Sequence, residues 1–167
     1  MDQYICKIAT IEEINKKWDY QISRESINIQ NQIILKKNNI ERHKKRHIIQ
    51  YYGLLNSKII CECTAALNSS VVQNAENLVD EKTAYLTAFR TIDEYQGKGY
   101  FSKLFKFMIN DLKNRGYDKV TLGVEPTEIK NKQIYHSFGF DEHIKDGIEV
   151  YGDGTTIAVE YYGKSIK

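Results

Sequence analysis

The sequence predicts a mixed α/β fold, with helices on both faces of a mostly antiparallel sheet. Segments rich in Thr, Tyr, Val and Ile alternate with segments in which apolar residues recur at helical spacing. Residues 48–67 and 140–162 each contain two neighbouring strand-like segments, which suit antiparallel pairs. The length of 167 residues and the 41% of hydrophobic residues suit one domain with a single core, spanning residues 1–167.

The first elements are a short strand and two helices. Residues 4–9 predict the strand, and Thr10 with Glu13 three positions later forms a capping box that opens a helix. A second helix is predicted over residues 26–47. Its C-terminal half is strongly basic, with Lys36, Lys37, Arg42, Lys44, Lys45 and Arg46.

This basic end has two interpretations: a phosphate or nucleic-acid patch, or a solvated helix end whose cations complement the helix dipole. The formal net charge of +2 favours the second, and we expect no nucleic-acid partner. No apolar run approaches the ~20 residues of a membrane span, so we expect no membrane partner. An odd number of cysteines, three, fits a reduced cytoplasmic protein.

A hairpin follows, with strands predicted at residues 48–55 and 58–67 and a turn at Asn56–Ser57. Cys61 and Cys63 share one face of the second strand, because side chains alternate along a strand. A zinc site would need two further ligands, so we interpret this pair as core residues and expect no metal. Residues 68–81 are polar and lack periodicity, which predicts a loop.

The centre of the chain combines a strand, a glycine-rich turn and an amphipathic helix. Residues 82–92 predict the strand, and apolar residues from Phe101 to Leu112 fall on one helical face. Gly97 and Gly99 lie between these two elements. The free N–H groups of a first helical turn and the positive end of the helix dipole favour an anion, and glycines let it come close. We therefore expect a phosphate or pyrophosphate ligand.

Two common phosphate loops are excluded. The P-loop pattern GxxxxGK[ST] is absent, and the dinucleotide-binding pattern would need a glycine where Ser102 stands. The run from Gln96 to Phe101 instead resembles the pyrophosphate loop of the GNAT N-acetyltransferase superfamily, Gln/Arg-x-x-Gly-x-Gly/Ala. Gln96 and Gly99 match this pattern, whereas Phe101 replaces its small last residue.

A second motif has the order and spacing of the same family. After a strand at residues 119–124 and Pro126, a short helix is predicted over residues 128–137. The stretch from Ile134 to Phe140 is similar to the GNAT ending in which a helical tyrosine, here Tyr135, precedes a Gly-Phe pair. The resemblance spans roughly residues 84–140.

The resemblance implies an N-acetyltransferase that moves an acetyl group from acetyl-CoA to an amine. It also implies a sheet that opens at the two strands flanking the cofactor helix. The backbone of Phe89, Arg90 and Thr91 would pair with the pantetheine arm. The pyrophosphate would be held by Gln96, Gly97, Lys98, Gly99, Tyr100, Phe101 and Ser102.

The resemblance makes Tyr135 the general acid, because a phenol is protonated at neutral pH and can donate to the departing sulfur. Asn131, one turn earlier, would contact the cofactor, although the family's usual asparagine position holds Glu128. For the base, position 123 is a glycine, and Glu125 on the same side of the strand is the candidate. Tyr135 as a packing residue, Glu125 as a surface acid, and no dedicated base are the alternatives.

The last two strands are predicted at residues 140–145 and 155–162, with an acidic, glycine-rich connection over 146–154. Acidic residues in and before this connection favour a cationic acceptor, the alternative being that they only solubilise a turn: Asp141, Glu142, Asp146, Glu149 and Asp153. An acyl-CoA-binding sensor without efficient turnover is the competing function. A homodimer is left open.

Overall fold

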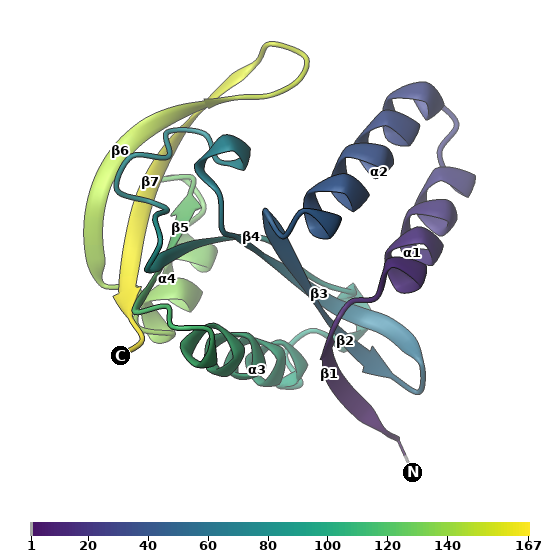
Figure 1. The fold of residues 1–167 in the computed structure, drawn as a ribbon, viewed down its shortest axis with the longest axis horizontal. Coiled ribbons are helices and arrows are strands. Elements are labelled where there is room, and N and C mark those ends of the chain that lie inside the picture. The colour runs from purple at the N-terminus through teal and green to yellow at the C-terminus, as the bar shows by residue number, and fades with distance from the viewer. Residues whose placement is uncertain (1) are drawn as a thin grey trace. The chain divides into compact units, whose positions relative to one another are not determined.

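The computed structural model describes residues 2–167 (Figure 1). In chain order the helices and strands are β1 (Tyr4–Ile8), α1 (Ile11–Ser23), α2 (Ile29–Lys44), β2 (Ile48–Leu55), β3 (Lys58–Ala66), β4 (Thr83–Thr91), α3 (Tyr100–Asn114), β5 (Lys119–Val124), α4 (Ile129–Ser137), β6 (Glu142–Val150) and β7 (Thr156–Ser165). Within this described part, seven strands form one sheet in the order β1-β2-β3-β4-β5-β7-β6. The expected mixed α/β fold is confirmed.

The sheet is antiparallel at β1–β2, β5–β7 and β6–β7, and parallel at β4–β5. The parallel ladder joins residues 83–86 of β4 to residues 119–122 of β5, and among the described residues it goes no further. Ala88, just beyond the ladder, has φ of 57°, a left-handed conformation that is rare for a residue with a side chain. The two strands are therefore paired only along the first half of β4.

The chain forms two compact units. The first consists of residues 2–64 and 88–107, and the second of residues 65–87 and 108–167. The boundary falls within β3, β4 and α3, so these three elements contribute to both units. Among residues 2–167, no helix has the length and apolar character needed to cross a membrane.

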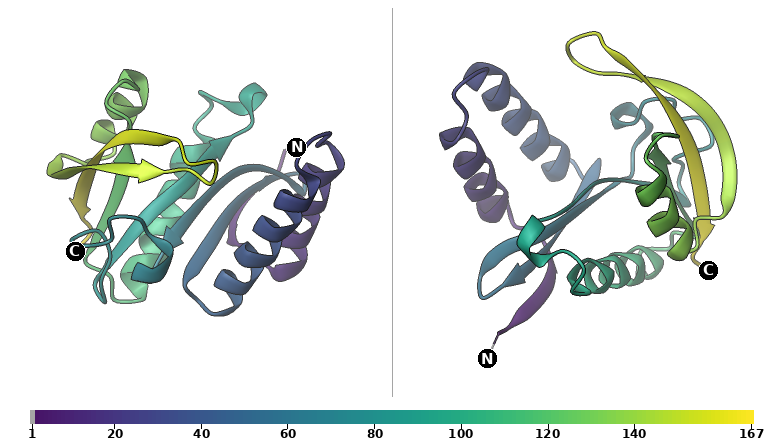
Figure 2. Two further views of the ribbon diagram at one scale, coloured as in Figure 1. Left: turned by 90° about the horizontal axis from the view of Figure 1, so that it is seen from above. Right: turned by 180° about the vertical axis from the view of Figure 1, so that it is seen from behind.

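In the first unit, α1 and α2 lie side by side (Figures 1 and 2). The predicted capping box is present: Glu13 N–H donates to Thr10 Oγ1 at 3.1 Å, and Thr10 N–H donates to Glu13 Oε1 at 2.9 Å. Ile14 then packs with Ala9 and Tyr52 in a buried cluster. The cap thus sets the start of α1 so that its apolar face meets the sheet strand β2.

Tyr4 connects the edge strand β1 to the start of α3. Its ring lies over Gly53 of β2, where an added Cβ would be 2.1 Å from the Tyr4 hydroxyl oxygen. The same hydroxyl donates to the Tyr100 carbonyl at 2.8 Å, and the two rings are 4.7 Å apart. Because Gly53 has no side chain, β1 can hold the first residue of α3 in place.

In the second unit, the core cluster contains Leu78, Val159 and Tyr161. Thr121 of β5 is also buried and donates its hydroxyl hydrogen to the Leu78 carbonyl at 2.6 Å, which fixes the segment before β4 to the sheet. Helix α4 lies beside the β6–β7 hairpin (Figure 2). These elements bring β4, β5 and β7 side chains into one cluster.

The final hairpin is longer than the sequence predicts. Strand β6 continues to Val150, whereas the expected strand stopped at residue 145 and residues 146–154 were expected to form a connection. Residues 146–150 pair with residues 160–156 of β7. The glycine and the acidic residues that favour a turn are thus overridden by ladder hydrogen bonds, and the connection is confined to residues 151–155.

Candidate functional site

The two glycines before α3 have the conformation and the open surroundings that a phosphate loop needs. Gly97 and Gly99 have φ of 73° and 84°, the left-handed region that glycine adopts without steric cost. An added Cβ at either position would have no atom within 4 Å. The Gly99 carbonyl accepts from Lys103 N–H at 3.2 Å, the first bond of the helix. Gly99 therefore caps α3, and the space above it is open.

Three backbone donors of this turn are unpaired among the described residues. Among residues 2–167, no acceptor bonds the backbone N–H of Gly97, Lys98 or Gly99. The positive end of the α3 dipole adds to their attraction for an anion. The Lys98 ammonium lies 5.8 Å from the centre of the Tyr95 ring, so a cation is present beside these donors. The arrangement can bind a phosphate through backbone N–H groups.

The end of β4 lies next to this turn in the same unit. The Phe89 and Phe101 rings meet edge to face at 5.6 Å, which joins the strand to the first turn of α3. Gln96 Nε2 donates to the Thr91 carbonyl and to Asp93 Oδ1, each at 3.2 Å. The position of Gln96 in the motif is thus explained by holding the loop against the strand end. A cavity of about 610 Å³ lies along residues 89–96.

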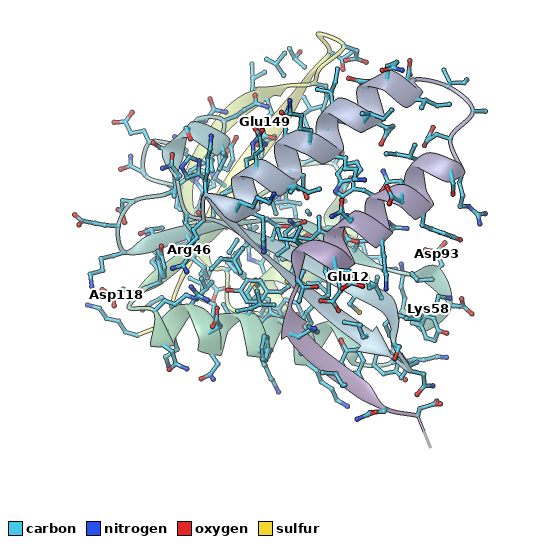
Figure 3. The ribbon with its side chains drawn as sticks, turned by 45° about the vertical axis from the view of Figure 1, so that its right-hand side comes forward. Glu12, Arg46, Lys58, Asp93, Asp118 and Glu149 are labelled. Atoms are coloured by element: carbon cyan, nitrogen blue, oxygen red, sulfur yellow. The ribbon has the colours of Figure 1, made fainter. Side chains whose placement is uncertain are left out.

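A larger cavity of about 970 Å³ in the first unit was missed by sequence reasoning. It is lined by α1, by the turn between β2 and β3, by β3, and by residues just after β4. Lys17 and Glu62 form an ion pair in it at 2.8 Å, with side chains only 17% and 14% exposed. Lys58, labelled in Figure 3, lies on its lining and is 3.6 Å from Glu94. In the sequence, Lys17 is indistinguishable from an ordinary surface lysine.

Arg90 lines both cavities of the first unit. Among the described residues its guanidinium forms no hydrogen bond or ion pair. Side chains alternate along the end of β4, so Phe89 and Thr91 are partly covered whereas Arg90 is exposed. Of the three residues that are predicted to contact pantetheine, Arg90 therefore carries an unpaired cation beside the strand backbone.

In the second unit, Tyr135 lies on α4 and is half-buried. Burial, and secondarily the charge of Glu128, raises the pKa of Tyr135 above its ordinary value. The phenol is therefore a protonated hydrogen-bond donor at neutral pH, as a general acid must be.

Glu125, the predicted base, follows β5 and belongs to a chain of polar side chains. A hydrogen bond with the Glu128 carboxyl, followed by burial and by the Glu128 charge, raises the Glu125 pKa. Glu128 in turn accepts a hydrogen bond from Asn131 Nδ2. The structure thus brings Glu125, Glu128 and Asn131 together. Asn131, which was predicted to contact the cofactor, is hydrogen-bonded to Glu128.

Gly123 has no room for a side chain. An added Cβ would lie 2.8 Å from Val159 Cγ1, 2.9 Å from the Tyr85 hydroxyl oxygen and 3.0 Å from the Tyr161 ring. The Tyr161 hydroxyl donates to Glu149 Oε2 at 2.7 Å. The sequence shows only that position 123 is a glycine and has no carboxylate. That Tyr85 and Tyr161 occupy the space beside it becomes visible only from the packing of β4 and β7.

The family model described as the acetyltransferase (GNAT) family matches residues 13–140, well over half of the chain. No curated protein matches. The solved structure of an N-acetyltransferase from Staphylococcus aureus Mu50 is similar with a TM-score of 0.67 and 17% identity, over 99% of each chain.

Two further solved structures have the same fold. The ribosomal-protein-S18-alanine N-acetyltransferase from Escherichia coli has a TM-score of 0.68 and 15% identity, over 99% of this chain and 95% of the other. The YncA protein from Salmonella typhimurium, solved with its cofactor acetyl-CoA, has a TM-score of 0.64 and 12% identity, over 98% and 94%. At sequence identities of 12–17%, the similarity to these solved structures shows the fold alone.

Proposed function

Because this chain belongs to the GNAT acetyltransferase family, we propose that it transfers an acetyl group from acetyl-CoA to a primary amine. The observation that carries this proposal is the turn before α3. Two glycines at positive φ leave open space above three N–H groups that bond nothing within the described chain. A pyrophosphate fits this set of donors, since charge-assisted hydrogen bonds to backbone N–H groups are strong.

The residues predicted to hold acetyl-CoA then have separate tasks. The backbone of Phe89, Arg90 and Thr91 pairs with the amides of pantetheine, in the manner of an added strand. The turn and first helical residues, from Gln96 to Ser102, hold the pyrophosphate, and Asn131 contacts the cofactor. The open cavity along residues 89–96 supports the first two assignments.

Tyr135 is the proposed general acid. As the C–S bond of the tetrahedral intermediate breaks, the electron pair leaves on sulfur, and the phenol supplies a proton to it. Its raised pKa keeps the proton available at neutral pH. Glu125 is the carboxylate proposed from the sequence to take the amine proton, and a hydrogen bond with the Glu128 carboxyl raises its pKa.

A cationic small molecule is the proposed acceptor. The acids of the β6–β7 hairpin supply negative charge, although several are already bound: Glu142 pairs with Lys119 and Asp146 with His143, each at 2.8 Å. The E. coli neighbour acts on a ribosomal protein, as its name states, but 15% identity transfers no acceptor to this chain. A panel of cationic, neutral and anionic amines at low and high salt tests the charge preference.

Release of free CoA thiol from acetyl-CoA in the presence of amines is the test of the reaction itself. Turnover with any amine supports the transferase. Tight binding of acetyl-CoA without turnover would instead support the sensor, which keeps the phosphate turn but lacks efficient catalysis.

The remaining expectations are also proposals. One domain is supported by β4 and α3, each of which continues through both compact units. A cytoplasmic location is consistent with the free thiols of Cys6, Cys61 and Cys63. Apolar side chains on α2 are exposed, as a homodimer contact would need, and sedimentation of the purified protein tests that state.

A further inference from the structure

In the second unit, Tyr161 lies between two glycines of the neighbouring strands. Strand β7 runs between β5 and β6, which carry Gly123 and Gly147. An added Cβ on Gly123 would be 3.0 Å from Cε1 of the Tyr161 ring, and one on Gly147 would be 3.0 Å from Cε2. Real Cβ atoms rarely come so close to another heavy atom. The position of this ring therefore depends on the absence of a side chain at both positions.

The hydroxyl of Tyr161 is thereby directed to Glu149 on β6, which is labelled in Figure 3. It donates to Glu149 Oε2 at 2.7 Å. Asn74 Nδ2 donates to the Tyr161 hydroxyl at 2.9 Å and to the Ile148 carbonyl at 3.0 Å. Burial is the main cause that raises the pKa of Tyr161, to about 12, so this hydroxyl is protonated at neutral pH. One oxygen of a half-exposed carboxylate is thus held in place by a buried donor.

Within the described part of the chain, Glu149 forms no ion pair. Lys145, the cation of the same strand, lies 5.9 Å from the centre of the Tyr161 ring and donates to the carbonyls of Asn74 and Glu76. From β4, the Tyr85 ring is 6.3 Å from the Tyr161 ring. Burial, and then the charge of Glu149, raises the pKa of Tyr85, which is therefore also protonated.

Position 123 of β5, the glycine where the family resemblance would place a base, lies next to the residues around Glu149. A Cβ there would be 2.9 Å from the Tyr85 hydroxyl oxygen and 3.0 Å from the Tyr161 ring. Glu125, by contrast, is hydrogen-bonded to a second carboxyl group, that of Glu128. A carboxylate that is held by a phenol, and that forms no ion pair among residues 2–167, is the better receptor for a cation than one of two carboxyl groups that share a hydrogen bond.

Building on the proposed acetyltransferase function, we propose that Glu149 binds the ammonium group of the acceptor and takes its proton. Tyr161 and Asn74 are positioning residues, because they fix the carboxylate and do not touch the amine. This assignment takes the place of the sequence-based candidate, Glu125. It puts the base on β6, because position 123 of β5 is a glycine and carries no carboxylate.

The reaction then balances as follows. The ammonium group gives one proton to the Glu149 carboxylate, and the freed lone pair forms a C–N bond to the thioester carbonyl carbon. The C–S bond breaks with its electron pair on sulfur. The departing sulfur takes the proton of the Tyr135 hydroxyl. A second proton leaves the nitrogen as the amide forms and passes to the Tyr135 phenolate, which restores the phenol. The products are the acetamide, CoA thiol and one proton released from Glu149 to water.

The test compares Glu149→Gln with Asp118→Asn, which removes the same charge from the residue before β5, outside the β6–β7 hairpin. We expect Glu149→Gln to lower kcat/KM for the amine about 100-fold or more. The KM for acetyl-CoA stays unchanged. Asp118→Asn changes kcat/KM for the amine less than threefold.

Tyr161→Phe provides a second reading that a purely structural role would not produce. Without the hydroxyl that holds Glu149, kcat/KM for the amine is expected to fall about 10-fold while the KM for acetyl-CoA stays unchanged, a split that a general loss of structure would not produce. Far-UV circular dichroism and Tm show that each variant is folded.

If the wild type turns over and Glu149→Gln has the same kcat/KM for the amine, the proposal is overturned and the transferase function is left intact. The same holds if Glu125→Gln shows the loss instead. Absence of turnover in the wild type with every amine would overturn the transferase function, and the role of Glu149 with it.

Discussion

Substitution of Gly99 by glutamate is expected to abolish acyl-CoA binding without unfolding the protein. A side chain at φ of 84° costs about 1–2 kcal/mol, which for a chain of this size lowers Tm by roughly 2–8 °C. No atom lies within 4 Å of the new Cβ, so no steric clash adds to this cost. The fold should therefore survive.

The loss of binding is expected to be much larger. Hydrogen bonds to charged groups contribute about 1.5–3 kcal/mol each, and a side chain over the turn displaces the pyrophosphate from at least two N–H groups. The resulting 3–6 kcal/mol corresponds to a loss of roughly 10²–10⁴-fold in affinity, before any repulsion from the new carboxylate. Isothermal titration calorimetry with CoA measures this loss directly.

Gly154 offers a matched control. It has φ of 88°, and an added Cβ there would also meet no atom within 4 Å, but it lies in the connection between β6 and β7. Gly154→Glu should lower Tm by a similar amount and leave the affinity for CoA unchanged. If Gly99→Glu is folded and binds CoA as tightly as the wild type, the turn is not the phosphate site.

Three other substitutions test separate parts of the structure. Tyr135→Phe should lower kcat on the order of 10–1,000-fold with the KM for acetyl-CoA unchanged, and an unchanged kcat for the chemical step in rapid-quench experiments would exclude the acid role. Gly123→Ala should cost about 1–3 kcal/mol in urea unfolding because its Cβ would lie 2.8 Å from a valine methyl, whereas Gly152→Ala, with open space, should cost little. Although partial burial opposes it, hydrogen bonds from Thr10 and the charge of a nearby lysine lower the pKa of Glu13. Glu13→Gln should therefore reduce stability at pH 7, and its difference from the wild type should shrink as pH falls through the lowered pKa of Glu13; an equal difference at pH 7 and at pH 2 would contradict the carboxylate's role.

The sequence by itself determined the elements whose signals are local. The capping box of Thr10 and Glu13 requires only a spacing of three residues, and the structure contains it. The helix after Gly99 and the glycine conformations before it follow from periodicity and from the steric freedom of glycine, and both are present. These features could be predicted because the interacting atoms are close along the chain.

The tertiary structure decided the features that depend on contacts between distant strands. The extension of β6 to Val150 results from pairing with β7, which overrides the turn preference of its glycine and acidic residues. Lys17 and Glu62 pair across 45 residues, and Tyr161 reaches Glu149 only because two other strands carry glycines beside its ring. A single sequence shows each of these residues but not its neighbour in space, since packing between separate strands is not encoded in any local pattern.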